Sequence, residues 1–124
     1  MKKKILFVED NPFIKVLAEE TFNEEYDVVY ASNGKEAMRV LQDLPLPDLI
    51  ISDLSMPEMT GMEFYKEISH SLVLREIPFV VLSANDSSDE KIACLELGIT
   101  DFLAKPFNPR ELFLRTKNLI SKAA

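Results

Sequence analysis

Apolar residues gather in five short runs that are separated by longer amphipathic stretches. Most of the runs consist of β-branched or aromatic residues and are nearly continuous, which is typical of strands in a parallel sheet covered on both faces. The second run is the weakest. The predicted strands are Ile5–Val8, Asp27–Tyr30, Leu49–Ile51, Phe79–Leu82 and Phe102–Ala104.

The stretches between these runs carry signals of helix starts. Asn11 and Asn108 each precede a proline, a pattern in which asparagine caps the helix and proline occupies its first turn. Asn33 stands three positions before Glu36, which indicates a second capped start. Gly61 opens a third predicted helix, and a fourth begins shortly after the fourth strand. Helices therefore follow all five predicted strands.

Within each predicted helix, apolar residues recur at a spacing that places them on one face. Pro45 is expected to end the second helix and Gly98 the fourth. Asp86 or Ser87 is the expected N-cap of the fourth helix. The expected inward-facing sets are Ile14, Leu17, Ala18 and Thr21; Ala37, Val40, Leu41 and Leu44; Phe64, Tyr65 and Ile68; Ile92, Cys94 and Leu95; and Leu112, Phe113, Thr116, Leu119 and Ile120.

Alternating strands and helices predict an α/β fold of the (βα)5 type with a doubly wound five-stranded parallel sheet. Right-handed crossovers place helices on both faces of such a sheet. We expect the strand order 2-1-3-4-5, and no linker or repeat interrupts the pattern. Residues 1–124 are therefore predicted to form a single domain.

Composition narrows the classes of function. The chain is 47% hydrophobic and 28% charged, which supports a real core. Its net charge of −7 argues against direct binding of nucleic acid. No apolar run approaches the roughly 20 residues that a membrane span needs. The single Cys94 allows no internal disulfide, and with no apparent secretory signal it favours a cytoplasmic location.

The polar residues that follow the apolar runs carry the candidate chemistry. The first strand ends in Glu9 and Asp10, the third in Asp53, the fourth in Ser83 and the fifth in Lys105. The carboxyl ends of parallel strands share one edge, where open α/β sheets bind ligands. Crowded carboxylates repel one another unless a cation compensates them. Donors that are all oxygens favour Mg²⁺, although for any one of the acids taken alone a helix cap is the better explanation.

Asp53 differs from the other acids because it ends a buried strand and precedes a long loop. A carboxylate is a modest nucleophile, but phosphoryl transfer depends mainly on charge stabilisation. Lys105 would act as a point charge on an incoming phosphoryl group, and Ser83 would donate a hydrogen bond to it. The pattern is therefore compatible with phosphorylation of Asp53.

Four motifs in this order resemble the receiver domains of bacterial response regulators. They are Glu9-Asp10-Asn11, Asp53-Leu54-Ser55-Met56-Pro57 with Gly61 downstream, Leu82-Ser83-Ala84, and Phe102-Leu103-Ala104-Lys105-Pro106-Phe107. Each motif alone is weak, and the four together are specific. The resemblance spans Lys4 to about Ser121 and implies a flavodoxin-like fold.

The resemblance also implies roles for individual residues. Asp53 would be the phosphoacceptor. Mg²⁺, with Mn²⁺ as a possible substitute, would be held by carboxylates of Asp10 and Asp53, by the backbone carbonyl of Ser55, and by Glu9 mainly through a coordinated water. The domain would catalyse only its own phosphorylation and dephosphorylation, so it is not expected to be a conventional enzyme.

The switch residues follow from the same resemblance. Ser83 would turn toward the phosphoryl group on activation, and the rotamer of Phe102 would follow. Lys105 would contact the phosphoryl group, and the Lys105–Pro106 bond would be cis. Three positions depart from common family residues: Glu9 replaces aspartate, Ser83 stands where threonine is frequent, and Phe102 lacks the hydroxyl of the frequent tyrosine.

The implied partners are a sensor histidine kinase or a phosphotransfer protein, together with a downstream protein or an output domain elsewhere in a longer chain. The switch would act on the surface of the fourth helix, fifth strand and fifth helix. Candidate contact residues on that surface are Lys91, Glu96, Arg110 and Lys117.

Three other classes compete with this interpretation. A receiver-like interaction module without phosphorylation would typically have lost Asp53, Lys105 or an acidic ligand, and all are present. A haloacid-dehalogenase-type phosphatase would need an aspartate at position 55, where Ser55 stands. A flavodoxin-like cofactor binder would need a polar phosphate loop after the first strand, which is absent.

Overall fold

The computed structural model, which describes residues 2–56, 58–84 and 88–123, contains one five-stranded sheet. All neighbouring strands are parallel, in the order β2-β1-β3-β4-β5, which confirms the predicted topology. The elements are β1 (Lys3–Val8), α1 (Pro12–Phe22), β2 (Tyr26–Ala31), α2 (Gly34–Val40), β3 (Leu49–Asp53), α3 (Gly61–Ser69), the 3₁₀ turn η1 (Leu74–Glu76), β4 (Phe79–Ser83), α4 (Ser88–Glu96), β5 (Asp101–Ala104) and α5 (Pro109–Ala123).

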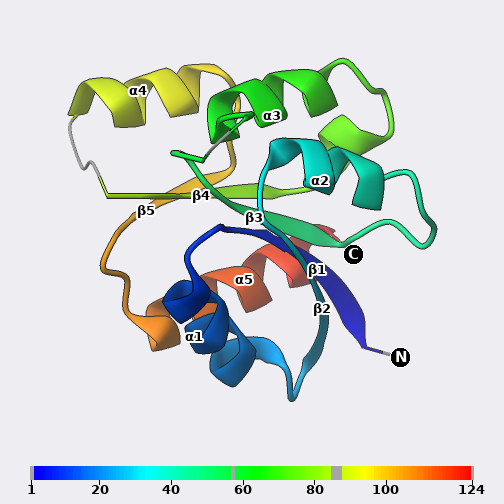
Figure 1. Ribbon diagram of the computed structural model, residues 1–124, viewed down its shortest axis with the longest axis vertical. Coiled ribbons are helices and arrows are strands. Elements are labelled where there is room, and N and C mark those ends of the chain that lie inside the picture. Colours follow the sequence, from blue (N-terminus) through cyan, green and yellow to red (C-terminus); the bar gives the residue numbers. More distant parts are fainter. Residues whose placement is uncertain (1, 57, 85–87, 124) are drawn as a thin grey trace.

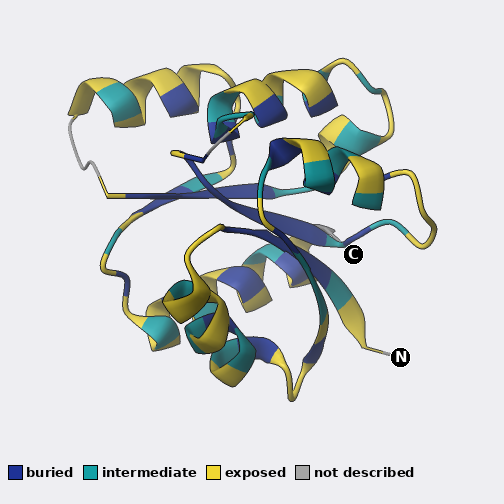
Figure 2. Cartoon of the chain, viewed as in Figure 1, coloured by how far each residue is buried: buried dark blue, intermediate teal, exposed yellow. Residues whose placement is uncertain are grey.

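The sheet forms the middle of three layers. Helices α1 and α5 cover one face, and α2, α3 and α4 cover the other (Figure 1). In β1, Ile5 and Phe7 pack with α1 and α5, whereas Leu6 and Val8 pack with the opposite helices. Figure 2 shows the central strands largely buried, the edge strand β2 mostly half-buried and the outer faces of the helices exposed. Since successive strand residues point to opposite faces and both are covered, the strands read as continuous apolar runs.

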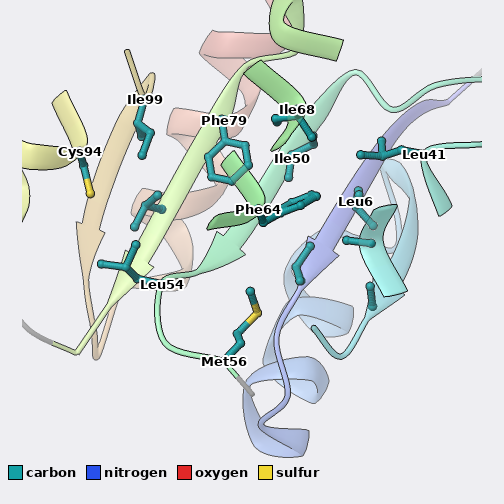
Figure 3. Packing of buried hydrophobic residues seen from close by; sticks show 14 of the residues in the cluster. Leu6, Leu41, Ile50, Leu54, Met56, Phe64, Ile68, Phe79, Cys94 and Ile99 are labelled. Carbon is teal, nitrogen blue, oxygen red and sulfur yellow. The ribbon is translucent and has the colours of Figure 1, made fainter. Parts of the chain in front are cut away.

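Aromatic packing holds α3 against β4. The ring centroids of Phe64 and Phe79 lie 5.6 Å apart, and those of Tyr65 and Phe79 lie 5.0 Å apart. Figure 3 shows Phe64 and Phe79 beside Ile50 and Ile68 in the same cluster. Contacts of this kind add to the free energy gained by burying the rings. They also anchor α3, which follows the loop after Asp53.

The predicted helix starts are confirmed where the structure describes them. The side chain of Asn11 accepts a hydrogen bond from the Phe13 amide at 2.8 Å, and Asn108 accepts one from Arg110 at 2.8 Å. The start of α3 is a capping box between Thr60 and Glu63, which the sequence analysis missed. Such caps satisfy amides that have no partner within the helix. No helix in the described ranges has the length and apolar character to cross a membrane.

The predicted second helix is too long. Helix α2 ends at Val40, and Leu44, expected on its inward face, is 82% exposed. After the helix the backbone forms a tighter turn, in which the Asp43 amide donates a hydrogen bond to the carbonyl of Val40. Because a residue before proline disfavours the helical conformation, Leu44 cannot continue the helix into Pro45.

The inward face predicted for the fourth helix is also wrong in part. Cys94 is fully buried, as expected, but Ile92 and Leu95 are each 51% exposed. At 3.6 residues per turn, Cys94 and Ile92 lie on nearly opposite sides of a helix, so both cannot face the core. The structure turns Cys94 inward. Gly98 follows the helix with a φ of +93°, a conformation that favours glycine, which confirms the predicted end.

Candidate functional site

The polar residues at the carboxyl ends of the strands meet at one edge of the sheet. The Glu9 amide donates to the carbonyl of Ala31 at 2.9 Å, which continues the pairing of β1 with β2. The Lys105 amide, directly after β5, likewise donates to the carbonyl of Ser83, the last residue of β4, at 2.7 Å. Asp53 is the last residue of β3, between these pairs. Backbone bonds of the sheet therefore fix where these side chains start.

Three carboxylates converge at this edge. Glu9, Asp10 and Asp53 each offer an oxygen, and these oxygens lie within 4.8 Å of one another. Glu9 and Asp53 are buried, whereas Asp10 is exposed and gives the group access to solvent. This is a compact, partly enclosed set of oxygen donors of the kind that hard divalent cations prefer.

The Lys105 ammonium lies against two of these acids. Its Nζ is 3.0 Å from Oε1 and 3.2 Å from Oε2 of Glu9, and 3.2 Å from Oδ1 of Asp53. The contact with Glu9 was not foreseen from the sequence. Its one signal is the residue type, because glutamate carries one methylene more than the aspartate common at this position. The Lys105–Pro106 peptide bond is cis, as the resemblance implied.

Electrostatics at this edge favour added positive charge. Burial raises the pKa of Glu9 to about 7; Lys105 opposes the rise, and the charge of Asp53 adds to it. Partial burial by itself lowers the pKa of Lys105, but the hydrogen bond to Glu9 and the charges of Glu9 and Asp53 outweigh it, so the pKa is raised. One ammonium does not balance three crowded carboxylates, which suits the site to a divalent cation.

Strand β4 ends at Ser83, next to strand β3, which ends at Asp53. Asp53 pairs in register with Leu82, so Ser83 lies one position further along the neighbouring strand. Its hydroxyl donates a hydrogen bond of 2.5 Å to Oε1 of Glu90 in α4. The sequence analysis assigned no role to Glu90, because no local pattern links a strand end to a residue seven positions later.

Phe102 is already turned into the protein. It is 9% exposed and belongs to the core cluster beneath α2, α3 and α4. The sequence analysis expected it to turn inward only after Ser83 moved. The structure shows an inward Phe102 together with a Ser83 hydroxyl bonded to Glu90 of α4.

Gly61 packs directly against the backbone that carries Asp53. A Cβ at this position would lie 2.8 Å from the Cα of Leu54 and would clash with the carbonyl oxygen of Asp53. The Gly61 amide also donates to the carbonyl of Leu54 at 2.9 Å. Gly61 thus lies directly against the backbone from which the Asp53 side chain extends.

The other singled-out residues are placed as follows. Ser55, two positions beyond Asp53, is exposed. Pro57 of the same motif lies outside the described residues, as do the expected helix caps Asp86 and Ser87. Cys94 is a buried free thiol whose sulfur lies 3.8 Å from that of Met62, which agrees with its expected packing role.

Comparison with known proteins agrees with this arrangement. The family model of the response regulator receiver domain matches residues 5–117. The receiver domain of the sensor histidine kinase PA1611 from Pseudomonas aeruginosa, described with a magnesium ion coordinated in its active-site cleft, superposes with a TM-score of 0.87 at 30% identity. That alignment covers 98% of this chain and 99% of the other.

Longer relatives contain a similar segment. Histidine kinase P4 of Formosa agariphila is 39% identical over 119 residues, which are 96% of this chain and 9% of that protein. The alkaline phosphatase synthesis regulator PhoP of Bacillus subtilis is 36% identical over 124 residues, 99% of this chain and 50% of that protein. The chain thus spans half or less of these relatives. By its motifs, topology and family match, it belongs to the response regulator receiver domains of two-component systems.

Proposed function

We propose that this receiver domain accepts a phosphoryl group on Asp53 within a two-component phosphorelay. The observation that carries the proposal is the Lys105 ammonium 3.2 Å from Oδ1 of Asp53, in a cluster with two further carboxylates. This arrangement provides a carboxylate oxygen as the nucleophile and a fixed positive charge beside it. Both are what phosphoryl transfer requires of a protein.

The residues of this acidic cluster fit a magnesium ion. Asp10 and Asp53 would supply carboxylate oxygens, Ser55 its backbone carbonyl, and Glu9 would act mainly through a coordinated water. The magnesium ion described for the PA1611 receiver domain supports this assignment. When bound, Mg²⁺ would supply positive charge that neutralises phosphoryl oxygens. Mn²⁺ prefers similar oxygen donors and would be an acceptable substitute.

The proposed transfer is a direct displacement. A carboxylate oxygen of Asp53 attacks phosphorus, an O–P bond forms, and the P–N bond of a phosphohistidine breaks, so that the imidazole leaves with the bonding electrons. With a small donor such as acetyl phosphate, the P–O bond breaks and acetate leaves. Lys105 stabilises the charge on the transferred group. The attacking group is a carboxylate oxygen, which has no proton to lose, so no general base is needed.

Phosphorylation would switch the surface made by α4, β5 and α5. The added charge of about −2 would draw the Ser83 hydroxyl toward the phosphoryl oxygens. This movement would bias the surface, including Phe102, between two states. Lys91, Glu96, Arg110 and Lys117 are exposed there and are the proposed contact residues.

The proposed donors are a sensor histidine kinase or a phosphotransfer protein, and the receiver of the signal is a downstream protein or a linked output domain. Similarity to segments of histidine kinase P4 and PhoP supports both arrangements. We place the reaction in the cytoplasm, and we propose no direct contact with nucleic acid or membrane.

Intact-mass spectrometry tests the proposal directly. Incubation with acetyl phosphate and Mg²⁺ should add the mass of one phosphoryl group, and chelation of the metal should prevent the addition. Beryllofluoride, which mimics a phosphoryl group on a carboxylate, should bind only with Mg²⁺ present. A folded protein that gains no mass and binds no beryllofluoride would instead be the alternative, an interaction module without phosphorylation.

The affinity for Mg²⁺ should fall as the pH is lowered, because protons compete with the metal for the Glu9 carboxylate. Its pKa in the metal-free fold is about 7, above its ordinary value of 4.5, so the folded protein holds a proton there between these values. The free energy that this proton contributes to folding is fully present below pH 4.5 and is lost as the pH rises through 7. Magnesium must displace the proton, so the affinity should drop by up to roughly tenfold per pH unit below 7.

Calorimetric titration with Mg²⁺ between pH 5.5 and 8, in buffers of different ionisation enthalpy, measures the affinity and the proton release together. Glu9→Gln is the matched control, and it should bind more weakly with a flatter pH dependence. An equally steep profile in Glu9→Gln would assign the proton to another group.

A further inference from the structure

The Ser83 hydroxyl is hydrogen-bonded to a side chain of α4. It donates to Oε1 of Glu90 at 2.5 Å, and Ser83 is only 4% exposed. This is the short distance of a hydroxyl bonded to a charged carboxylate, which is about twice as strong as a bond between neutral groups. The contact therefore favours the Ser83 rotamer that points toward α4.

This rotamer competes with the one required for activation. A serine hydroxyl has a single hydrogen to donate. Asp53 and Ser83 end neighbouring strands, with Asp53 opposite Leu82. To donate to a phosphoryl oxygen on Asp53, the hydroxyl must leave the carboxylate of Glu90. The two hydrogen bonds exclude each other.

We infer that Glu90 is a positioning residue that holds Ser83 in the unphosphorylated orientation and so sets the threshold for switching. The inference rests on the proposed function, because it concerns the same hydroxyl. Part of the free energy of phosphoryl binding is consumed in breaking the bond to Glu90. The bond joins the end of β4 to the first turn of α4, so its release also frees one attachment of α4.

Glu90→Gln is the first test. Glutamine keeps the size and an acceptor oxygen but removes the charge, so the bond to Ser83 should weaken. In the presence of Mg²⁺, beryllofluoride should then bind roughly 3- to 10-fold more tightly than to the wild type. The affinity for Mg²⁺ alone should not change, because the effect operates only when Ser83 is drawn toward the ligand. Calorimetry measures both affinities.

Asp89→Asn is the matched control for charge. Asp89 is the neighbouring acidic residue in the first turn of α4, and its removal costs the same helix-dipole interaction. If the gain came only from removing a negative charge near an anionic ligand, Asp89→Asn would reproduce it. We expect Asp89→Asn to bind beryllofluoride as the wild type does, within about twofold.

The decisive comparison repeats Glu90→Gln in a protein that also carries Ser83→Ala. Without the hydroxyl, Glu90→Gln should no longer change the affinity for beryllofluoride, so the two substitutions should be strongly non-additive. An equal gain in both backgrounds would overturn the inference, as would a wild-type affinity in Glu90→Gln. Should Glu90→Gln unfold, Glu90→Asp, which keeps the charge but shortens the reach, should give the same gain.

Failure of this inference is distinguishable from failure of the proposed function. If the wild type binds no beryllofluoride, the phosphoacceptor role itself fails. If the wild type binds it and Glu90→Gln binds it equally or more weakly, only the role of Glu90 is overturned.

Discussion

Substitution of Asp53 by asparagine is expected to abolish stable phosphorylation by acetyl phosphate. The amide nitrogen is not a nucleophile and the remaining oxygen is neutral, so the yield should fall at least about 100-fold. The fold should survive, because asparagine has nearly the same shape and its substitution relieves repulsion among Glu9, Asp10 and Asp53. Intact-mass spectrometry measures the yield, and thermal unfolding without metal should give an equal or higher midpoint.

Asp43→Asn is the matched control, since it removes the same charge at an exposed position outside the acidic cluster. It should be phosphorylated like the wild type. If Asp53→Asn instead gained a phosphoryl group at the wild-type rate, another residue would be the acceptor and the assignment of Asp53 would be wrong.

Substitution of Gly61 by alanine is expected to destabilise the domain and displace Asp53. The added Cβ would meet backbone atoms of Asp53 and Leu54, which cannot move without shifting the end of β3. Overpacking against backbone should cost about 3 kcal/mol. For a domain of this size that loss corresponds to roughly 10–15 °C in melting temperature. Phosphorylation measured well below the melting temperature should also slow, because the nucleophile is moved relative to Lys105.

Gly34→Ala is the control for helix propensity. Gly34 and Gly61 each begin a helix after a capping residue, but a Cβ at Gly34 would meet only the side chain of Met59. Because the Cβ of Met59 would lie 2.9 Å away and is fixed by the backbone, Gly34→Ala should also cost stability, but it leaves the end of β3 in place, so phosphorylation well below the melting temperature should be unchanged. Equal slowing of phosphorylation by the two substitutions would show that the approach to Asp53 is not what Gly61 provides.

Elements with a strong local pattern could be predicted closely. Strand β3 was expected over Leu49–Ile51 and extends to Asp53, because burial on both faces demands an unbroken apolar run. The Asn-Pro starts of α1 and α5 were correct because the cap and the proline are set by adjacent backbone atoms. Helix faces were less predictable, as Ile92 and Leu95 show. The rotation of a helix about its axis depends on what it packs against.

The same division applies to the site. That Glu9, Asp10, Asp53, Ser83 and Lys105 stand at one edge could be predicted, because all end or follow strands whose carboxyl ends share an edge in a parallel sheet. The partners of these side chains could not. Contacts such as Lys105 to Glu9 and Ser83 to Glu90 depend on ångström-scale distances between segments, and residue type alone does not encode them.

The amino-acid sequence by itself determined the alternation of strands and helices, the strand order and the placement of polar residues at one edge. Each of these follows from local chemistry and general rules of chain topology. Only the tertiary structure decided which acid pairs with Lys105, why residue 61 is glycine, and where the Ser83 hydroxyl points. These depend on packing between segments far apart in the chain, where a shift of one ångström separates a hydrogen bond from none.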